Sequence, residues 1–210
     1  MNAWILVGGR LTDTAELRRA RLETPDLVIA ADGGIRHAEL LGIRPDLWVG
    51  DFDSSDALDP RFSGIERQSV PRDKDFTDAE LALDIAKKHG ATKVTFWGAL
   101  GGRFDHALAL ALLSVREAQG GLDILLHSGD ESAAPLLPGR EIERTSFPGQ
   151  TLSILALDDL AGLFISGVRW PLRNVGVRTG SGWTVSNEAA GETVRASVGA
   201  GRALLIQHWP

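Results

Sequence analysis

Apolar runs alternate with helical patterns over the first 130 residues of the chain. Each run is short, mostly aliphatic and followed closely by glycine, as is typical of strands that are buried on both faces. The runs predict strands at residues 3–7, 27–31, 47–49, 93–97 and 122–127. Strands that are separated by helical segments predict a mostly parallel sheet with helices on both faces.

The predicted helices lie at residues 11–22, 35–41, 77–89 and 106–119. The clearest start is Thr77-Asp78-Ala79-Glu80, which fits a capping box with Thr77 as the N-cap and Glu80 reaching back from position N3. Gly42 directly follows the second helical segment, where it predicts a C′ glycine.

The pattern changes after Gly129. The segment Ala134–Gly139, with two prolines, predicts a linker. Short segments separated by turn residues then predict strands at residues 141–146, 151–157, 163–165, 175–178, 193–197 and 203–208. The predicted fold is therefore an α/β domain of residues 1–130, followed by a small antiparallel β-domain of residues 139–210.

Composition narrows the function classes. Hydrophobic residues make up 43% of the 210 residues and charged residues 24%, as in a globular protein. The formal net charge of −6 disfavours a nucleic-acid partner, and the lack of cysteine excludes disulfides and thiolate metal sites. No apolar stretch approaches the ~20 residues of a membrane helix, and the start has no basic segment typical of a signal peptide. We expect a soluble, cytoplasmic protein without a membrane partner.

Acidic, glycine-rich motifs follow the predicted strands. Ligands of open α/β sheets bind beyond the carboxyl ends of the strands, so these motifs should meet at one edge of the sheet. The first motif is Asp32-Gly33-Gly34, whose glycines would let backbone N–H groups approach a phosphate. Taken alone, this motif is better explained as a tight turn between strand and helix.

The second motif, Gly50-Asp51-Phe52-Asp53-Ser54-Ser55, places two carboxylates one residue apart after a strand. Their mutual repulsion is relieved by a cation or a proton, and Mg²⁺ prefers such oxygen ligands. The alternative is a solvated acidic loop, but the preceding buried strand favours a metal site.

The third and fourth motifs stand at the starts of two predicted helices. The third motif is the charged stretch of residues 71–78, which contains Lys74 and Asp78 and leads into the capped helix. Asp78 also has a purely structural explanation, because a carboxylate in the first turn of a helix interacts favourably with the helix dipole. In the fourth motif, Gly101 and Gly102 give space for phosphate, and Arg103 and Asp105 offer a guanidinium clamp and a metal ligand. The alternative for the fourth motif is a flexible loop in which Asp105 caps a helix.

No P-loop, dinucleotide-binding or serine-hydrolase motif is present in the sequence. The four motifs, in this order, resemble those of the thiamine pyrophosphokinase family. Residues 167–172 and Ser186-Asn187-Glu188 resemble the thiamine-binding region of that family. The resemblance implies transfer of a pyrophosphoryl group from Mg-ATP to the hydroxyl of thiamine, in a homodimer with sites at the subunit interface.

The resemblance also implies roles for individual residues. The residues expected around Mg²⁺ and the ATP phosphates are Asp51, Asp53, Asp78 and Asp105, with Arg103 as a further catalytic group. The residues expected to bind nucleotide or thiamine are Asp32, Gly33, Gly34, Lys74, Thr77, Gly101, Gly102, Trp170, Ser186 and Asn187. Trp170 and Trp183 are each candidates for cation–π contact with the thiazolium ring, or for core residues of the small domain.

Two other functions stay open at this point. Gly50-Asp51-Phe52-Asp53 resembles the D-x-D motif of haloacid dehalogenase-type phosphatases, in which Asp51 would be the nucleophile. A late acidic motif in the first domain, which that class needs, is not found. The second alternative is a non-catalytic protein that binds nucleotide or thiamine.

Overall fold

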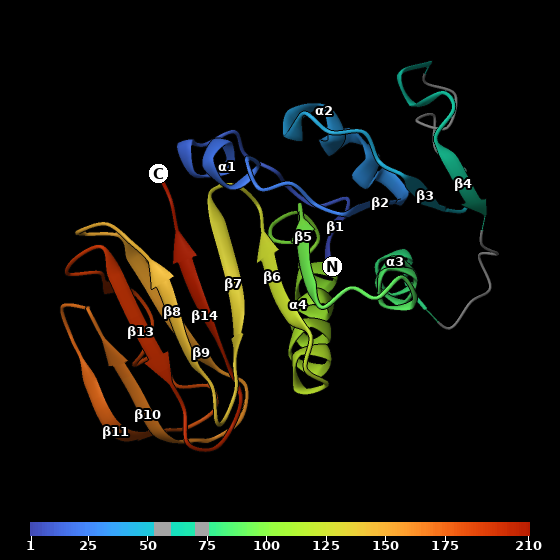
Figure 1. Cartoon of the computed structure of the whole chain (residues 1–210). Helices are drawn as coiled ribbons and strands as arrows, with labels where there is room; N and C mark the ends of the chain where they lie inside the picture. Colours follow the sequence, from blue (N-terminus) through green and yellow to red (C-terminus); the bar gives the residue numbers. More distant parts are fainter. Residues whose placement is uncertain (53–59, 70–75) are drawn as a thin grey trace.

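The computed structural model describes residues 1–52, 60–69 and 76–210. Over these residues the chain forms one ten-stranded sheet and a second, four-stranded antiparallel sheet (Figure 1). Asp53 and Lys74, which the sequence predicts as site residues, lie outside the described part.

Six neighbouring strands of the large sheet come from the first part of the chain and are parallel, in the order β6-β5-β1-β2-β3-β4. Their bounds are β1 Asn2–Leu6, β2 Leu27–Ala31, β3 Leu47–Gly50, β4 Glu66–Ser69, β5 Lys93–Trp97 and β6 Asp123–His127. β1 lies between β2 and β5, so the strand order reverses beside β1. The sequence missed β4, because its four residues are polar and exposed at the edge of the sheet.

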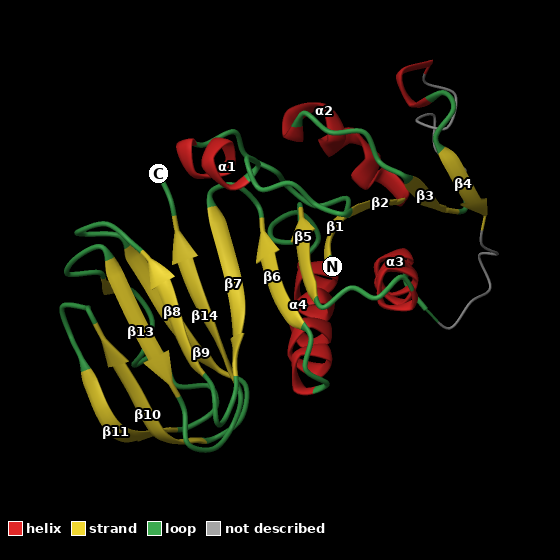
Figure 2. Cartoon of the chain, in the orientation of Figure 1, coloured by secondary structure: helices red, strands yellow, loops and turns green. Residues whose placement is uncertain are grey.

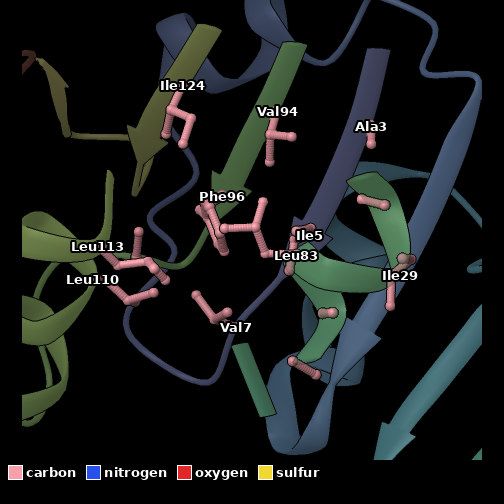
Figure 3. Close-up of a cluster of buried hydrophobic side chains, with 14 of the residues drawn as sticks. Ala3, Ile5, Val7, Ile29, Leu83, Val94, Phe96, Leu110, Leu113 and Ile124 are labelled. Atoms are coloured by element: carbon pink, nitrogen blue, oxygen red, sulfur yellow. The ribbon is translucent and has the colours of Figure 1, made fainter. Parts of the chain in front are cut away.

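Helices cover both faces of this parallel part. They are α1 Ala15–Ala20, α2 His37–Leu41, α3 Asp78–Lys88 and α4 Phe104–Gln119, with short 3-10 turns at Asp32–Arg36 and Pro60–Phe62. One core cluster joins α3 and α4 to alternate strand residues such as Ile5 and Phe96 (Figure 3). A second cluster joins α1 and α2 to the opposite face, through residues such as Trp4 and Leu6.

The helix starts follow local capping. The predicted capping box is confirmed: Thr77 Oγ1 accepts from the Glu80 N–H at 3.2 Å, and Glu80 Oε2 accepts from the Thr77 N–H at 3.0 Å. α1 is shorter than predicted, because the Thr14 side chain caps its N-terminus by accepting from the Leu17 N–H. No helix in the described part of the chain is long and apolar enough to cross a membrane.

The remaining strands extend the large sheet and add the small one (Figure 2). Antiparallel strands β7 Glu131–Leu136, β14 Ala203–His208, β9 Thr151–Ala156 and β12 Asn187–Glu188 continue the large sheet beyond β6. The small sheet contains β11 Leu172–Val177, β10 Leu160–Ser166, β13 Thr193–Ser197 and β8 Glu141–Thr145. An apolar core between the two sheets includes Leu136, Ile154 and Val194.

The linker predicted at Ala134–Gly139 is wrong for its first half, because residues to Leu136 belong to β7. Pro135 lies opposite Leu204 of β14, whereas the pairing of β7 with β6 involves only Ser132 and Ala133. Proline has no backbone N–H, so it fits a strand position that has no partner on that side. The predicted fold class, a helix-covered and mostly parallel sheet followed by antiparallel β-structure, is confirmed.

Candidate active site

A pocket of about 470 Å³ lies at the carboxyl ends of β1, β2 and β5. The N-termini of α3 and α4 also reach this pocket, and it lies beside β1, where the strand order reverses. Such a switch point is where open α/β sheets bind ligands. The lining residues are Val7, Gly8, Gly9, Ala31, Asp32, Gly33, Arg36, Thr77, Asp78, Ala79, Glu80, Gly98, Ala99, Gly101, Arg103, His106, Ala107, Ala109, Leu110 and Leu113.

Glycine turns after β1 and β5 pack against each other in the wall of this pocket. A Cβ atom at Gly9 would overlap with the carbonyl oxygen of Gly98, so only glycine allows this approach. Gly98 and Gly101 have φ angles of 76° and 77°, which also favour glycine. The pocket wall is therefore largely backbone, which leaves N–H groups close to any bound group.

His37, the first residue of α2, holds these turns together. Its Nε2–H donates to the carbonyl oxygen of Gly9 at 2.9 Å. A Cβ atom at Gly98 would lie 2.7 Å from Nε2, so the imidazole is packed tightly against that turn. Burial lowers the pKa of His37, although its bond to Gly9 acts in the opposite direction.

The turn after β2 connects the pocket to the end of β3. The Asp32 backbone has a left-handed φ of 44°, and its carbonyl oxygen accepts from the Trp48 indole N–H at 2.9 Å. A Cβ atom at Gly50 would lie 3.3 Å from the Asp32 Cα, so the ends of β2 and β3 are in close contact. Asp51 follows this contact, and Phe52 has a left-handed φ of 56°.

The two helix N-termini bring charge to the pocket. Both Asp78 and Glu80 belong to the first turn of α3 and line the pocket. At the start of α4, the exposed Arg103 guanidinium makes two bonds to the Asp105 carboxylate, at 2.6 and 3.1 Å. These bonds lower the pKa of Asp105 to about 2. These bonds use Nε and Nη2 of Arg103, so the guanidinium can bind a phosphate with both edges only after it leaves Asp105.

Six of the residues predicted from the sequence line this one pocket: Asp32, Gly33, Thr77, Asp78, Gly101 and Arg103. Of the described residues predicted for the metal, the phosphates or catalysis, four do not line it, namely Gly34, Asp51, Gly102 and Asp105. Gly34 lies behind the pocket, where a Cβ atom would overlap with the Leu6 carbonyl. No group of three or more potential metal ligands is found within residues 1–52, 60–69 and 76–210.

The chain matches two family models. One is described as the thiamin pyrophosphokinase catalytic domain and matches residues 19–126. The other is described as the thiamin pyrophosphokinase vitamin B1 binding domain and matches residues 140–202. A thiamine pyrophosphokinase of Bacillus subtilis (strain 168) is 30% identical over 153 residues, which are 70% of this chain and 71% of the relative. The chain belongs to the thiamine pyrophosphokinase family.

Solved structures of thiamine pyrophosphokinases have the same fold. The Bacillus subtilis structure has a TM-score of 0.83 at 24% identity, and the comparison covers 99% of each chain. The Geobacillus thermodenitrificans structure has a TM-score of 0.82 at 25% identity, covering 100% of this chain and 98% of the other. Membership of the thiamine pyrophosphokinase family supports the kinase over the phosphatase and the non-catalytic binding protein.

A second cavity, of about 370 Å³, lies in the part matched by the vitamin B1 binding model. It is lined by Ile154, Ile165, Trp170, Leu172, Trp183, Thr184, Val185, Ser186 and Asn187. Three of these, Trp170, Ser186 and Asn187, are residues that the sequence predicts for thiamine. The Trp170 and Trp183 side chains are exposed rather than core residues.

The Asn187 side chain is already used within the chain. Its Nδ2 donates to the Trp170 carbonyl oxygen at 2.9 Å, and its Oδ1 accepts from the Trp170 N–H at 3.2 Å. Asn187 therefore positions the backbone of Trp170, whose ring is left at the cavity. The Arg169 guanidinium lies 4.7 Å from the centroid of that ring, which shows that the indole face attracts a cation.

Sequence reasoning missed several residues of the first pocket. Gly8, Gly9 and Arg36 line the pocket, and His37 supports it from behind. The Gly8-Gly9 pair after the first strand was a usable signal, since the other strand-end glycines were read as phosphate-binding. His37 had no signal of its own, because its contact with Gly9 exists only in the fold.

Proposed function

We propose that the chain transfers a pyrophosphoryl group from ATP to thiamine. The hydroxyl oxygen of thiamine attacks the β-phosphorus, the bond from that phosphorus to the oxygen of the α-phosphate breaks, and AMP leaves. The products are thiamine diphosphate, AMP and the proton released by the hydroxyl. The observation that carries the proposal is the pocket in which two helix N-termini and two glycine turns meet. Such a group of N–H donors favours a polyphosphate.

The protein mainly positions the two substrates and stabilises the negative charge of the phosphates, because phosphoryl transfer needs little covalent chemistry from the enzyme. The glycine turns and the N-termini of α3 and α4 would hold the phosphates. Arg103 would move from Asp105 to the phosphate oxygens, where its planar guanidinium binds two oxygens at once. Lys74 is proposed as a second cation for the polyphosphate.

The donor chemistry at the pocket fits Mg²⁺. Magnesium commonly takes one or two protein carboxylates and completes its shell with waters and substrate phosphates. Asp78 lines the pocket and Asp51 follows β3 at the same edge of the sheet. We propose these two, with Asp53 and Asp105, as the residues that hold the ion. When bound, Mg²⁺ would neutralise phosphate charge as it develops.

Thiamine is proposed to bind at the second cavity. The thiazolium ring carries a positive charge, which suits the exposed indole of Trp170. The Ser186 N–H donates to Ser153 Oγ at 3.0 Å, which fixes the backbone of Ser186, and Ser186 lines the cavity. Ser186 is therefore the better candidate for a direct polar contact, and Asn187 for a positioning residue.

A homodimer would bring the two cavities together across the subunit interface. Exposed apolar side chains support this proposal: Phe104, Leu108 and Leu112 form a stripe at four-residue spacing on α4, and they are 78%, 43% and 51% exposed. Such a stripe is typical of a surface that packs against a partner. A cytoplasmic location and the absence of nucleic-acid and membrane partners stay predictions from composition.

The direct test is a turnover assay with purified protein, Mg-ATP and thiamine. We expect AMP and thiamine diphosphate in equal amounts, and no AMP without thiamine. Asp78→Asn should lower kcat by ~10²-fold or more, the scale for losing one key electrostatic group. Asp84→Asn is the matched control, because Asp84 is an exposed residue of the same helix. Folded protein without thiamine-dependent AMP release would contradict the proposal.

The proposal that one active site is formed by the first pocket of one subunit and the second cavity of the other can be tested by mixing two inactive variants. Asp78→Asn has an intact thiamine cavity, and Trp170→Ala has an intact nucleotide pocket. Random exchange in a two-fold dimer would give heterodimers with one complete site each, and about a quarter of the wild-type activity would return. If each site lies within one subunit, mixing restores nothing.

A further inference from the structure

A third cavity, of about 500 Å³, lies on the face of the large sheet that is opposite α3 and α4. On this face the α1–α2 layer covers β1 to β3, and the small sheet covers β9 and β14. β5 and β6 lie between the two covering layers, and Thr95 of β5 and Leu125 of β6 form the floor of the cavity. α1 forms one wall and β8 forms another.

The floor and walls carry polar groups. Thr95 is 3% exposed and Ser132 is 4% exposed, and both line the cavity. His127 is 1% exposed; its Nδ1 accepts from the Gly129 N–H at 2.9 Å, which leaves the ring proton on Nε2. That Nε2–H has no acceptor among the described residues. The indole Nε1–H of Trp97, which also lines the cavity, has no acceptor among the described residues either. Buried polar groups without partners are rare in proteins, so two in one place point to a ligand.

Arg144 of β8 adds a cation to this wall. It lies opposite Val194, which belongs to the apolar core between the sheets, so Arg144 occupies an inward-facing position. Its guanidinium donates to the Glu143 carbonyl oxygen at 3.2 Å, and it has no ion pair with a carboxylate of the described residues. Burial lowers the pKa of Arg144, with Asp123 acting in the opposite direction. A half-buried guanidinium without a carboxylate is costly unless something else supplies the acceptors.

The charges around the cavity limit what can bind there. The lining includes four carboxylates and three cations: Glu16, Glu23, Asp123, Glu143, Arg19, Lys93 and Arg144. Arg19 pairs with Glu16, and Lys93 pairs with Glu23. A polyphosphate would be strongly repelled by this excess of carboxylates. A ligand with one negative charge meets less repulsion and can bind Arg144, which Asp123 also attracts.

We propose that this cavity binds a small planar monocarboxylate. The carboxylate would bind the Arg144 guanidinium through two parallel hydrogen bonds, and the hydroxyls of Thr95 and Ser132 would contact polar atoms of the ligand. Its ring would pack on Trp209, which lines the cavity and stacks on His127 with ring centroids 5.6 Å apart. The cavity volume is within the usual range for small-molecule sites. No described residue lines both this cavity and the pocket at the carboxyl ends of β1, β2 and β5.

A competing explanation is that Arg144 only protects the edge of the small sheet. β8 is an edge strand, and inward-pointing charges on such strands discourage pairing between molecules. That role needs a positive charge but no particular geometry. It does not account for the unpartnered N–H groups of His127 and Trp97.

The test follows the indole N–H signals in a ¹H–¹⁵N NMR spectrum of the full chain. The six tryptophans give six such signals, and Trp209→Phe identifies that of Trp209. The probes are benzoate, nicotinate and indole-3-acetate, each titrated to about 20 mM, which saturates a site of millimolar Kd. We expect at least one of them to shift the Trp209 signal saturably, with nicotinamide and tripolyphosphate binding at least about tenfold more weakly.

Binding by variants distinguishes a carboxylate site from a role of Arg144 in protecting the edge of the small sheet. Arg144→Gln should abolish the shift, and Arg144→Lys should weaken binding by about tenfold, because lysine cannot bind a carboxylate with two parallel bonds. Arg140→Gln, at a nearby exposed position, should leave binding unchanged. Thr95→Val tests the floor if an Arg144 variant does not fold. The proposal is overturned if none of the three carboxylates shifts the Trp209 signal, or if binding persists unchanged in folded Arg144→Gln.

Discussion

The Nε2–H of His37 donates to the carbonyl oxygen of Gly9 at 2.9 Å, and it connects α2, behind the first pocket, to the turn that forms the pocket wall. The same imidazole packs against Gly98 of the neighbouring turn. One side chain thus fixes the relative positions of two turns whose N–H groups would face a phosphate. The pocket geometry depends on a residue that lies outside its lining.

Replacement of His37 by alanine should loosen both turns. We expect the KM for ATP to rise by about tenfold or more, with a smaller change in kcat, because displaced backbone donors weaken binding of the phosphates. The free energy of unfolding should fall by roughly 1–3 kcal/mol from the lost hydrogen bond and contacts. Steady-state kinetics and urea unfolding measure the two effects. An unchanged KM in a destabilised variant would mean that His37 only supports the fold.

Gly9 and Gly8 offer a matched pair of substitutions. In Gly9→Ala the new Cβ would overlap with the Gly98 carbonyl oxygen, and the backbone must move. In Gly8→Ala the nearest atoms would be 3.9 Å away, which is ordinary contact. We expect Gly9→Ala to lose about 3 kcal/mol of stability and most activity, while Gly8→Ala stays near wild type in stability. Equal thermal stability of the two variants would contradict the close approach.

The fold was predictable where the sequence has strong periodicity. Strand β2 has the predicted bounds, Leu27–Ala31, because a short aliphatic run followed by glycine has few alternatives. β4 and β7 were missed for opposite reasons. β4 is exposed, and its strand conformation comes from pairing with β3 rather than from burial. Pro135 made β7 resemble a linker, although β7 pairs with β6 only at Ser132 and Ala133 and needs no backbone N–H from Pro135 on that side.

The site was predictable only where a residue carries its own chemical signal. Asp78 and Arg103 stand in motifs of charge and glycine next to helix starts, and both line the pocket. Asn187 also stands in a motif, yet its amide is bound to the backbone of Trp170, a contact that sequence cannot show. His37 is the converse case, because it joins segments that are 28 residues apart without any motif.

The capping box of α3 gives a third prediction. Thr77→Ala removes the acceptor for the Glu80 N–H and should lower the free energy of unfolding by about 1 kcal/mol, the usual cost of losing an N-cap. Thr77→Ser keeps the hydroxyl and should restore most of this loss. Thermal unfolding of both variants measures the effect. A stability of Thr77→Ala equal to wild type would show that tertiary contacts alone fix the start of α3.

His127 should make stability depend on pH. Burial, and then the charge of nearby Arg19, lower its pKa from the ordinary value of 6.5 to about 4. The folded protein therefore resists protonation at a pH where the unfolded chain binds a proton, so this contribution is complete above pH 6.5 and is lost as the pH falls toward 4. At 1.36 kcal/mol for each unit of pKa, the loss is roughly 3 kcal/mol.

The variant His127→Asn tests this pH dependence, because asparagine does not titrate in this range. Its free energy of unfolding should be lower than that of wild type at pH 7, since the stacking of His127 between Trp97 and Trp209 is lost. The difference between the two proteins should then shrink between pH 6.5 and 4, because only wild type loses the histidine contribution. Urea unfolding at several pH values gives this difference directly, and carboxylates common to both proteins cancel in it. A difference that stays constant over this range would show that His127 is protonated in the folded protein as easily as in the unfolded chain.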